Sequence, residues 1–174
     1  MANRRQRRPG EDPPTLDPRG FTIAEYREYV EAVHEIGPGC LSRCSPRQLE
    51  HVMRAQGLSR LPGLYREFLL TLGGNPSPLL PSFDCRYPDL VQIKGYLIDD
   101  LSGDGLDTSF LDGTLVIGLA DGHFLLYIPG AETAGGDPPV WTSSDGFDRK
   151  RAYSSFREFL LAIADPRPGA VRIS

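Results

Sequence analysis

The chain has 174 residues, with 19 basic and 23 acidic side chains and a formal net charge of -4. This length suits one domain with a substantial core plus a tail, and is short for two domains. No apolar run approaches the roughly 18 residues of a membrane span, and no apolar segment of a signal peptide follows the basic N-terminus. Three cysteines are too few, and odd in number, for a disulfide framework, so we expect a cytoplasmic protein without membrane contact.

The charge is unevenly distributed along the chain. Residues 1–20 contain five arginines and three acidic residues, which gives +2 there and leaves -6 on the remainder. This basic arm has no hydrophobic periodicity, so we predict that it is disordered. The acidic remainder argues against a broad nucleic-acid-binding face and favours a basic protein partner.

The first predicted helix begins after Phe21. Thr22 and Glu25 have the spacing of a capping box, and Phe21 with Tyr26 has that of a hydrophobic staple. An apolar stripe then continues until Gly37 and Pro38, where we expect the helix to stop.

The second predicted helix repeats the capping-box pattern. Ser45 and Gln48 supply the box, Pro46 takes the first helical position, and Gly57 follows the last turn. Between Pro46 and Gly57 lie three apolar residues at helical spacing, Leu49, Val52 and Met53.

The stretch LPGLYREFLLTLGG, residues 61–74, predicts a third helix. Pro62 suits its first turn, and Gly73 and Gly74 can adopt the left-handed conformation that ends a helix. The buried stripe consists of Leu64, Tyr65, Phe68, Leu69 and Leu72. Leu70 projects to the opposite side, where we expect another part of the chain to cover it.

Four prolines between residues 75 and 88 predict a long loop without regular structure. The following segment, residues 90–101, is ambiguous. Its apolar spacing matches a helix, while Lys94-Gly95 between two apolar runs is also compatible with a hairpin turn. We favour the helix.

The C-terminal third changes period and predicts strands. The runs 114–119 and 123–128 flank Asp121-Gly122, a dipeptide suited to a tight hairpin turn. A short third strand is expected at 140–143, and Ser155 with Glu158 gives a third capping box for a final helix that ends at Asp165-Pro166. Helices, then a small antiparallel sheet, then a helix indicate a single α+β domain.

Metal and catalytic motifs are weak. Cys40 and Cys44 lie near His34, but a structural zinc site needs a second ligand pair, and the chain has none. Residues 100–105 imitate the start of a calcium loop, but Leu111 stands where a bidentate glutamate is required. His123 beside Asp121 is better read as an ordinary strand residue than as a catalytic dyad. We therefore expect no enzyme, no catalytic residues, no metal and no cofactor.

Acidic and aromatic residues in the C-terminal half suggest a surface for a basic partner. Carboxylates steer a basic protein toward the surface, and aromatic side chains supply buried anchors. The predicted partner-binding residues are Asp99, Asp100, Asp104, Asp107, Asp112, Asp121, Trp141 and Asp145.

The order of motifs resembles the SUKH superfamily, which includes bacterial toxin-immunity proteins and relatives of the yeast cell-wall assembly regulator. The similarity spans about residues 45–164 and rests on four segments in the family's order. These are SPRQLEHVMRAQGLSRLPGLYREFLLTLGG, DGTLVIGLADGHFLLYIPG, PPVWTSS and SSFREFLLAIA. Family members tend to carry asparagine before the paired glycines, whereas Asn75 follows Gly73 and Gly74 here, and the helix after Phe21 is an extension of the pattern.

The resemblance implies a SUKH-like α+β domain at residues 21–165, with a tail at 166–174. It also implies an immunity protein that binds a cognate polymorphic toxin, often a nuclease or deaminase in this superfamily, and occludes its active surface. A basic toxin would be the partner, without direct contact to nucleic acid, and a monomer is favoured. The alternative is a non-enzymatic scaffold or regulatory interaction module with the same fold.

Overall fold

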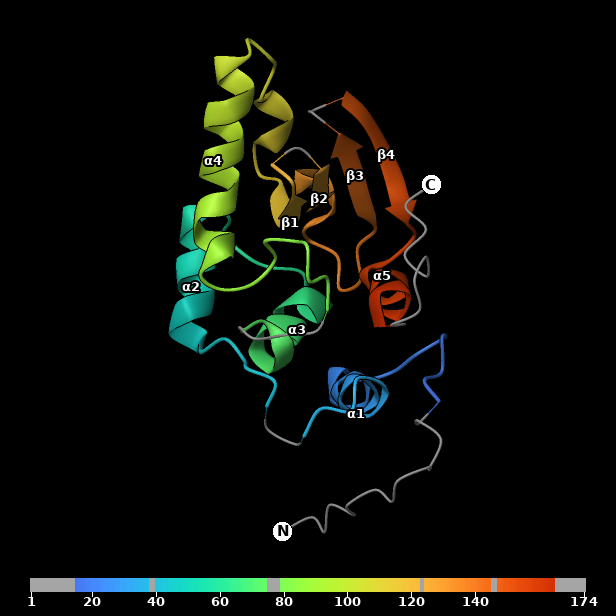
Figure 1. The fold of residues 1–174 in the computed structure, drawn as a ribbon. Helices are drawn as coiled ribbons and strands as arrows, with labels where there is room; N and C mark the ends of the chain where they lie inside the picture. Colours follow the sequence, from blue (N-terminus) through green and yellow to red (C-terminus); the bar gives the residue numbers. More distant parts are fainter. Residues whose placement is uncertain (1–14, 38–39, 75–78, 123, 145–146, 165–174) are drawn as a thin grey trace.

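A computed structural model describes residues 15–37, 40–74, 79–122, 124–144 and 147–164. The described chain contains five α-helices and a four-stranded antiparallel sheet of order β1-β2-β3-β4, which is the predicted α+β class (Figure 1). The elements are α1 (Ile23–Val33), α2 (Pro46–Ala55), α3 (Gly63–Leu72), α4 (Asp89–Gly103), β1 (Leu115–Ala120), β2 (Phe124–Ile128), β3 (Val140–Ser144), β4 (Phe147–Tyr153) and α5 (Phe156–Ala164). Two single-turn 3-10 helices are η1 (Ser109–Leu111) and η2 (Gly130–Glu132).

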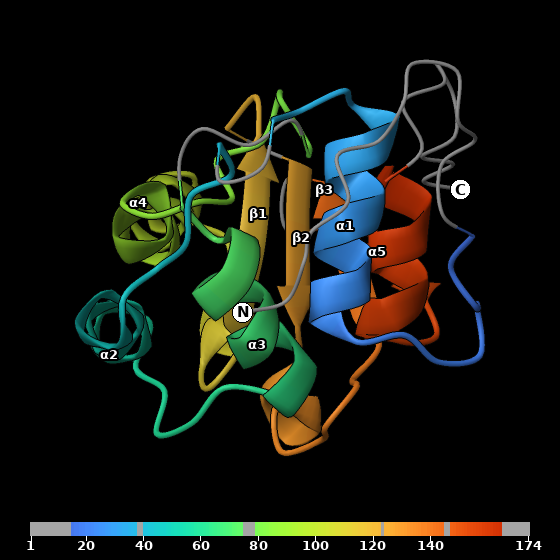
Figure 2. The ribbon, with the colours of Figure 1, turned by 90° about the horizontal axis from the view of Figure 1, so that it is seen from below.

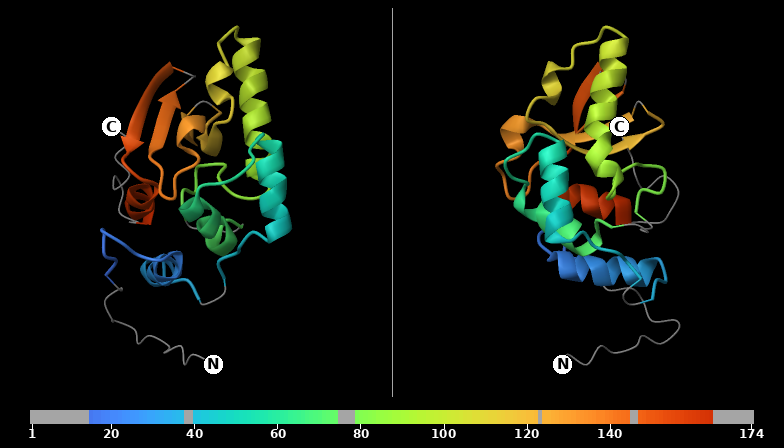
Figure 3. Two further views of the ribbon diagram at one scale, coloured as in Figure 1. Left: turned by 180° about the vertical axis from the view of Figure 1, so that it is seen from behind. Right: turned by 90° about the vertical axis from the view of Figure 1, so that its left-hand side faces the viewer.

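The sheet buries both faces because side chains alternate along each strand. On β2, Leu126 and Ile128 join a larger core cluster with α1, α2, α3 and α5. Leu125 and Tyr127 join a smaller cluster with α4 and η1. Figure 2 shows α3 across the sheet, α1 beside α5, and α2 with α4 on the β1 side; Figure 3 shows this grouping from two more directions.

Two of the three predicted capping boxes, those of Thr22 with Glu25 and of Ser45 with Gln48, are confirmed. The Thr22 hydroxyl accepts the N–H of Glu25 at 3.2 Å, the Glu25 carboxylate accepts the N–H of Thr22 at 2.7 Å, and the Phe21 and Tyr26 rings stack at 5.5 Å. Ser45 and Gln48 make the same reciprocal pair at the start of α2. These local interactions fix where α1 and α2 begin.

The predicted end of α1 is wrong. The helix stops at Val33, before the expected Gly37-Pro38, because Glu35 adopts a left-handed conformation with φ 53°. The Ile36 N–H then donates to the Glu31 carbonyl at 2.8 Å, the bond that closes a helix in a Schellman motif. Glycine usually holds this position, so a glutamate there is no signal that the helix stops.

The predicted helix at 61–74 is confirmed as α3, but the role given to its glycines is wrong. Gly73 has φ -77°, outside the left-handed region. A side chain has no room at Gly74, where a Cβ would lie 2.6 Å from the Cβ of Ser42. Leu70 is partly buried against the larger cluster, as predicted.

Residues 79–88 form turns without a helix or strand, as predicted; residues 75–78 lie outside the described chain. The ambiguous segment is helical: α4 buries Leu90, Ile93, Leu97 and Leu101 along one side. The Asp121-Gly122 turn also forms as predicted, with φ values of 52° and 78°. The third capping box forms only in part: the Ser155 hydroxyl accepts the N–H of Glu158 at 3.0 Å, but the Glu158 carboxylate accepts the N–H of Ser154, at 2.7 Å, and not that of Ser155.

Strand β4 was not predicted. Its sequence FDRKRAY is dominated by charged residues and lacks the apolar alternation of a half-buried strand. Residues 148–151 are exposed, and β3 is the strand's one partner in the described sheet, while Tyr153 at its end is buried against Phe159 of α5.

The structure describes only part of the two predicted terminal segments. Residues 1–14 of the predicted arm and 165–174 at the C-terminus lie outside the described chain. Residues 15–20 are described: Leu16 packs against the larger cluster, and the Gly20 N–H donates to the Asp17 carbonyl at 3.1 Å. Among the described helices, none has the length and apolarity needed to cross a bilayer.

Candidate partner-binding surface

Helix α4 presents an aromatic residue beside two carboxylates. Its apolar stripe faces the core, which turns Tyr96, Asp99 and Asp100 outward. Tyr96 is 63% exposed, and Asp99 and Asp100 follow it by three and four positions, so the three lie together on one helix face. An exposed aromatic flanked by acidic groups is suited to anchor a basic partner.

A buried polar network holds α4 in place. The Lys94 ammonium donates to the carbonyls of Gln56 at 2.7 Å and Thr114 at 2.9 Å, joining α4 to the end of α2 and the start of β1. Burial lowers the pKa of Lys94, and the nearby Asp112 carboxylate opposes that shift. Gln56 completes the network by donating to the Leu90 carbonyl at 3.1 Å.

The segment after α4 continues the acidic surface. Asp104, Asp107 and Asp112 are exposed, and none of them forms an ion pair with another described residue. Asp107 accepts the N–H and hydroxyl of Ser109, each at 2.9 Å, and these bonds lower the pKa of its carboxyl group. Asp107 therefore has a local structural role as well as an exposed charge.

A surface groove adjoins this acidic segment. Its volume is about 540 Å³, and it is lined by residues 57–60, 109–110, 112–114, 129–131 and 133. Among the described residues that line the groove, only Arg60 and Asp112 are charged. The groove is open and polar, which suits a loop of a protein partner better than a small apolar ligand.

The structure separates the eight predicted residues into different places. Asp99, Asp100, Asp104, Asp107 and Asp112 follow one another along α4 and the segment to η1. Asp121 is exposed in the β1–β2 turn, at the other end of β1 from Asp112, and six residues of strand span roughly 20 Å. Asp145 lies outside the described residues.

Trp141 belongs to the smaller cluster. Its ring lies 6.5 Å from that of Tyr127, and its side chain is partly buried. Its indole nitrogen is buried and has no hydrogen-bond partner among the described residues. Tyr96, the more exposed aromatic residue, was not among the predicted partner-binding residues. Its position off the apolar Leu90–Leu101 stripe was the sequence signal that would have placed it at the surface.

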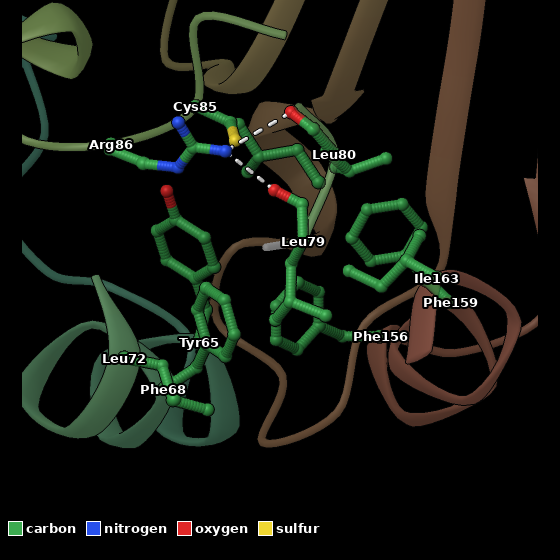
Figure 4. Close-up of a pocket in the computed structure, with 11 residues that line it drawn as sticks. Tyr65, Phe68, Leu72, Leu79, Leu80, Cys85, Arg86, Phe156, Phe159 and Ile163 are labelled. Carbon is green, nitrogen blue, oxygen red and sulfur yellow. Dashed lines mark hydrogen bonds between the residues drawn. The ribbon is translucent and has the colours of Figure 1, made fainter. Parts of the chain in front are cut away.

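A second cavity lies inside the larger cluster (Figure 4). Aromatic rings from α3 and α5 surround it, and Figure 4 shows the Tyr65 hydroxyl directed toward the Arg86 guanidinium and Cys85. Its volume is about 20 Å³, the scale of one water and far below the roughly 300 Å³ of a ligand pocket. Burial raises the pKa of Cys85 to about 11, which leaves the thiol protonated and unreactive at neutral pH.

The remaining predicted chemical groups are dispersed. The Cys44 thiol is buried and donates to the Gly73 carbonyl at 3.3 Å, whereas Cys40 is exposed. Asp100 and Ser102 of the calcium-like motif are part of α4, and His123 lies outside the described residues. In the described chain, no group of three or more His, Cys, Asp or Glu residues is placed to hold a metal ion.

Comparison with known proteins finds no matching family model, no matching curated protein and no matching solved structure. The α+β class therefore rests on the observed elements themselves. The resemblance to the SUKH superfamily stays a prediction from the sequence.

Proposed function

We propose that this chain is a non-enzymatic binding protein that neutralises a basic protein toxin, as an immunity protein does. The observation that carries the proposal is the outward face of α4, where Tyr96 is 63% exposed beside Asp99 and Asp100. Acidic groups attract a protein that grips phosphate through basic residues, and a central aromatic supplies contact area. Covering the basic active surface of a nuclease or deaminase would block its substrate.

The first test is co-expression of the chain with each toxin encoded beside its gene. The proposal expects a stable complex and protection of the cell from one of them. If the chain neither binds nor protects against any of these toxins, the proposal is wrong. Capture of housekeeping proteins in their place would favour the scaffold or regulatory role.

The second test asks whether the outward face of α4 is the surface that binds the toxin. Tyr96→Ala, and separately Asp99→Ala with Asp100→Ala, should each weaken toxin binding about thirtyfold, because hot-spot truncations cost about 2 kcal/mol. Glu28→Ala with Glu50→Ala is the matched control, since both glutamates are exposed on other helices. Loss of affinity in the control alone would move the interface away from α4.

A further inference from the structure

The two edge strands of the sheet, β1 and β4, differ in whether other parts of the chain bond to their outer backbone groups. On β1, these groups have partners. The Gln56 side chain donates to the Val116 carbonyl at 2.9 Å and accepts the Val116 N–H at 2.8 Å, as a neighbouring strand would. Further along, Asp84 and Leu119 exchange two backbone hydrogen bonds of 2.8 and 3.3 Å. These contacts occupy the outer edge of β1 and leave little room for another strand.

Strand β4 has no strand paired to its outer side among the described residues. In the described chain it pairs only with β3, and Figure 1 shows it as the outermost strand of the sheet. Residues 148–151 are exposed. Backbone groups that point away from β3 bond to solvent or to an added strand.

The open edge is also strongly basic. Arg149, Lys150 and Arg151 are consecutive, within a chain whose charge outside residues 1–20 is -6. The Arg149 guanidinium lies over the Phe110 ring, 4.7 Å from its centre, and Arg151 donates to the Ser154 carbonyl at 2.9 Å. Arg149 is therefore held by packing on Phe110 and Arg151 by its bond to Ser154, while the Lys150 side chain is exposed.

We propose that the outer edge of β4 binds an acidic, extended segment of a partner protein, which adds to the sheet as a fifth strand. Backbone hydrogen bonds at Lys150 and Arg151, where the register with β3 is regular, would supply pairing beyond the bulge at Asp148, which has φ 50°. The three basic side chains would select acidic neighbours. This surface is separate from the acidic face of α4, and the inference does not depend on the toxin proposal.

Charge argues against other occupants of the β4 edge. A second copy would set one Arg-Lys-Arg run against another, and like charges opposite each other destabilise strand pairs. The chain's own ends are also basic in their side chains: residues 1–14 carry four arginines and two acids, and residues 165–174 carry two arginines and one acid. Basic residues thus protect this edge from self-association and leave it open to an acidic segment.

The test uses a blocked synthetic peptide of alternating glutamate and valine, about as long as the seven residues of β4. Titrated into the isotope-labelled full chain, it should shift backbone amide resonances and slow hydrogen exchange at residues 148–152. A matched peptide of alternating lysine and valine should not bind. Lys150→Glu should weaken binding at least tenfold, whereas Arg54→Glu, the same charge change at an exposed position of α2, should leave it within twofold.

Several results would overturn the proposal. These are no saturable binding of the glutamate–valine peptide, shifts centred away from β4, equal binding of the lysine peptide, or an unchanged affinity for Lys150→Glu. Slowed exchange at β4 that depends on protein concentration without peptide would identify a second copy as the occupant. An unchanged amide spectrum away from β4 establishes that Lys150→Glu is folded, and Lys150→Thr, which removes the charge and favours a strand, should weaken binding in the same direction.

Discussion

Two buried tyrosines differ in one hydrogen bond. The Tyr26 hydroxyl donates to the Leu160 carbonyl at 2.8 Å, linking α1 to α5, whereas the Tyr65 hydroxyl is buried without a partner among the described residues. Burial of an unpaired hydroxyl costs free energy that a paired one recovers. The two side chains therefore contribute differently to stability despite equal burial.

Phenylalanine substitutions measure that difference. We expect Tyr26→Phe to lower the free energy of unfolding by about 1–2 kcal/mol, because it leaves the Leu160 carbonyl without its donor. Tyr65→Phe should be neutral or stabilising, since it removes a hydroxyl that makes no bond. Urea unfolding of both variants gives the comparison, and a clear destabilisation by Tyr65→Phe would mean that this hydroxyl has a partner.

Glu35 and Gly57 occupy matching positions after α1 and α2. Both are left-handed, with φ 53° and 67°, and no atom lies within 4 Å of a Cβ placed at Gly57. We expect Glu35→Gly to stabilise the fold by about 0.5–1 kcal/mol and Gly57→Ala to destabilise it by about 1 kcal/mol, because only glycine adopts this conformation without strain. Thermal unfolding should move the two midpoints in opposite directions; equal directions would contradict the backbone explanation.

These residues also show where single positions resist prediction. The stop at Gly57 was predictable because glycine signals it, whereas Glu35 adopts the same conformation with no such signal in the sequence. The lack of room at Gly74 comes from Ser42, a residue 32 positions away in sequence, so it follows only from the folded structure. Local chemistry was predictable from local sequence, and tertiary crowding was not.

At the scale of single elements, the start of α1 carries a pH dependence. The backbone N–H and hydroxyl of Thr22 bond to the Glu25 carboxylate and lower its pKa below the ordinary 4.5. A carboxyl group with a lowered folded-state pKa stabilises the fold above its unfolded pKa, and that contribution is lost as the pH falls through the folded value. Acid should therefore weaken the cap of α1.

Glu25→Gln isolates this charge, because glutamine can still accept a hydrogen bond, as Gln48 does at α2. The variant should be less stable than the native chain at neutral pH. The difference should begin to close near pH 4.5 and vanish in stronger acid. Unfolding measured across this pH range, with Glu28→Gln as an exposed control on the same helix, checks the effect; a constant difference would exclude Glu25 as its source.

Lys94 connects three elements through two buried bonds. Lys94→Met keeps the apolar stem but leaves the carbonyls of Gln56 and Thr114 without their donor. We expect a loss of roughly 2–4 kcal/mol in unfolding free energy, from two unsatisfied buried acceptors. Lys150→Met is the matched control and should change stability by less than about 0.5 kcal/mol, because Lys150 is exposed.

The elements with strong apolar periodicity were predictable, including α4 over the alternative hairpin. Strand β4 was not, because its backbone pairs with β3 while its charged side chains carry no strand pattern. Lys94 and Tyr96 were not predicted because their burial is the opposite of what their residue types suggest. Lys94 is polar but buried in a hydrogen-bond network, and Tyr96 is aromatic but exposed by its place on the helix. The acidic part of the candidate surface was predictable from composition, and its aromatic anchor Tyr96 from a position off the apolar stripe once the segment is taken as a helix.

At the scale of the whole molecule, the sheet is shared by two core clusters. Leu125 and Leu126 are neighbours on β2, each 1% exposed, and they enter the smaller and larger cluster respectively. Because the same strand supports both, neither cluster can lose its packing without disturbing the sheet that the other packs against. The described domain should therefore unfold as one cooperative unit.

Alanine at each leucine tests this coupling. Leu125→Ala and Leu126→Ala should each cost about 2–5 kcal/mol, as truncations of buried leucine do. Fluorescence of Trp141 reports the smaller cluster and far-ultraviolet circular dichroism reports all elements, so both signals should change at one denaturant concentration in each variant. Separate transitions in Leu125→Ala, with the tryptophan signal lost first, would mean that α4 and the smaller cluster unfold independently of α1, α3 and α5.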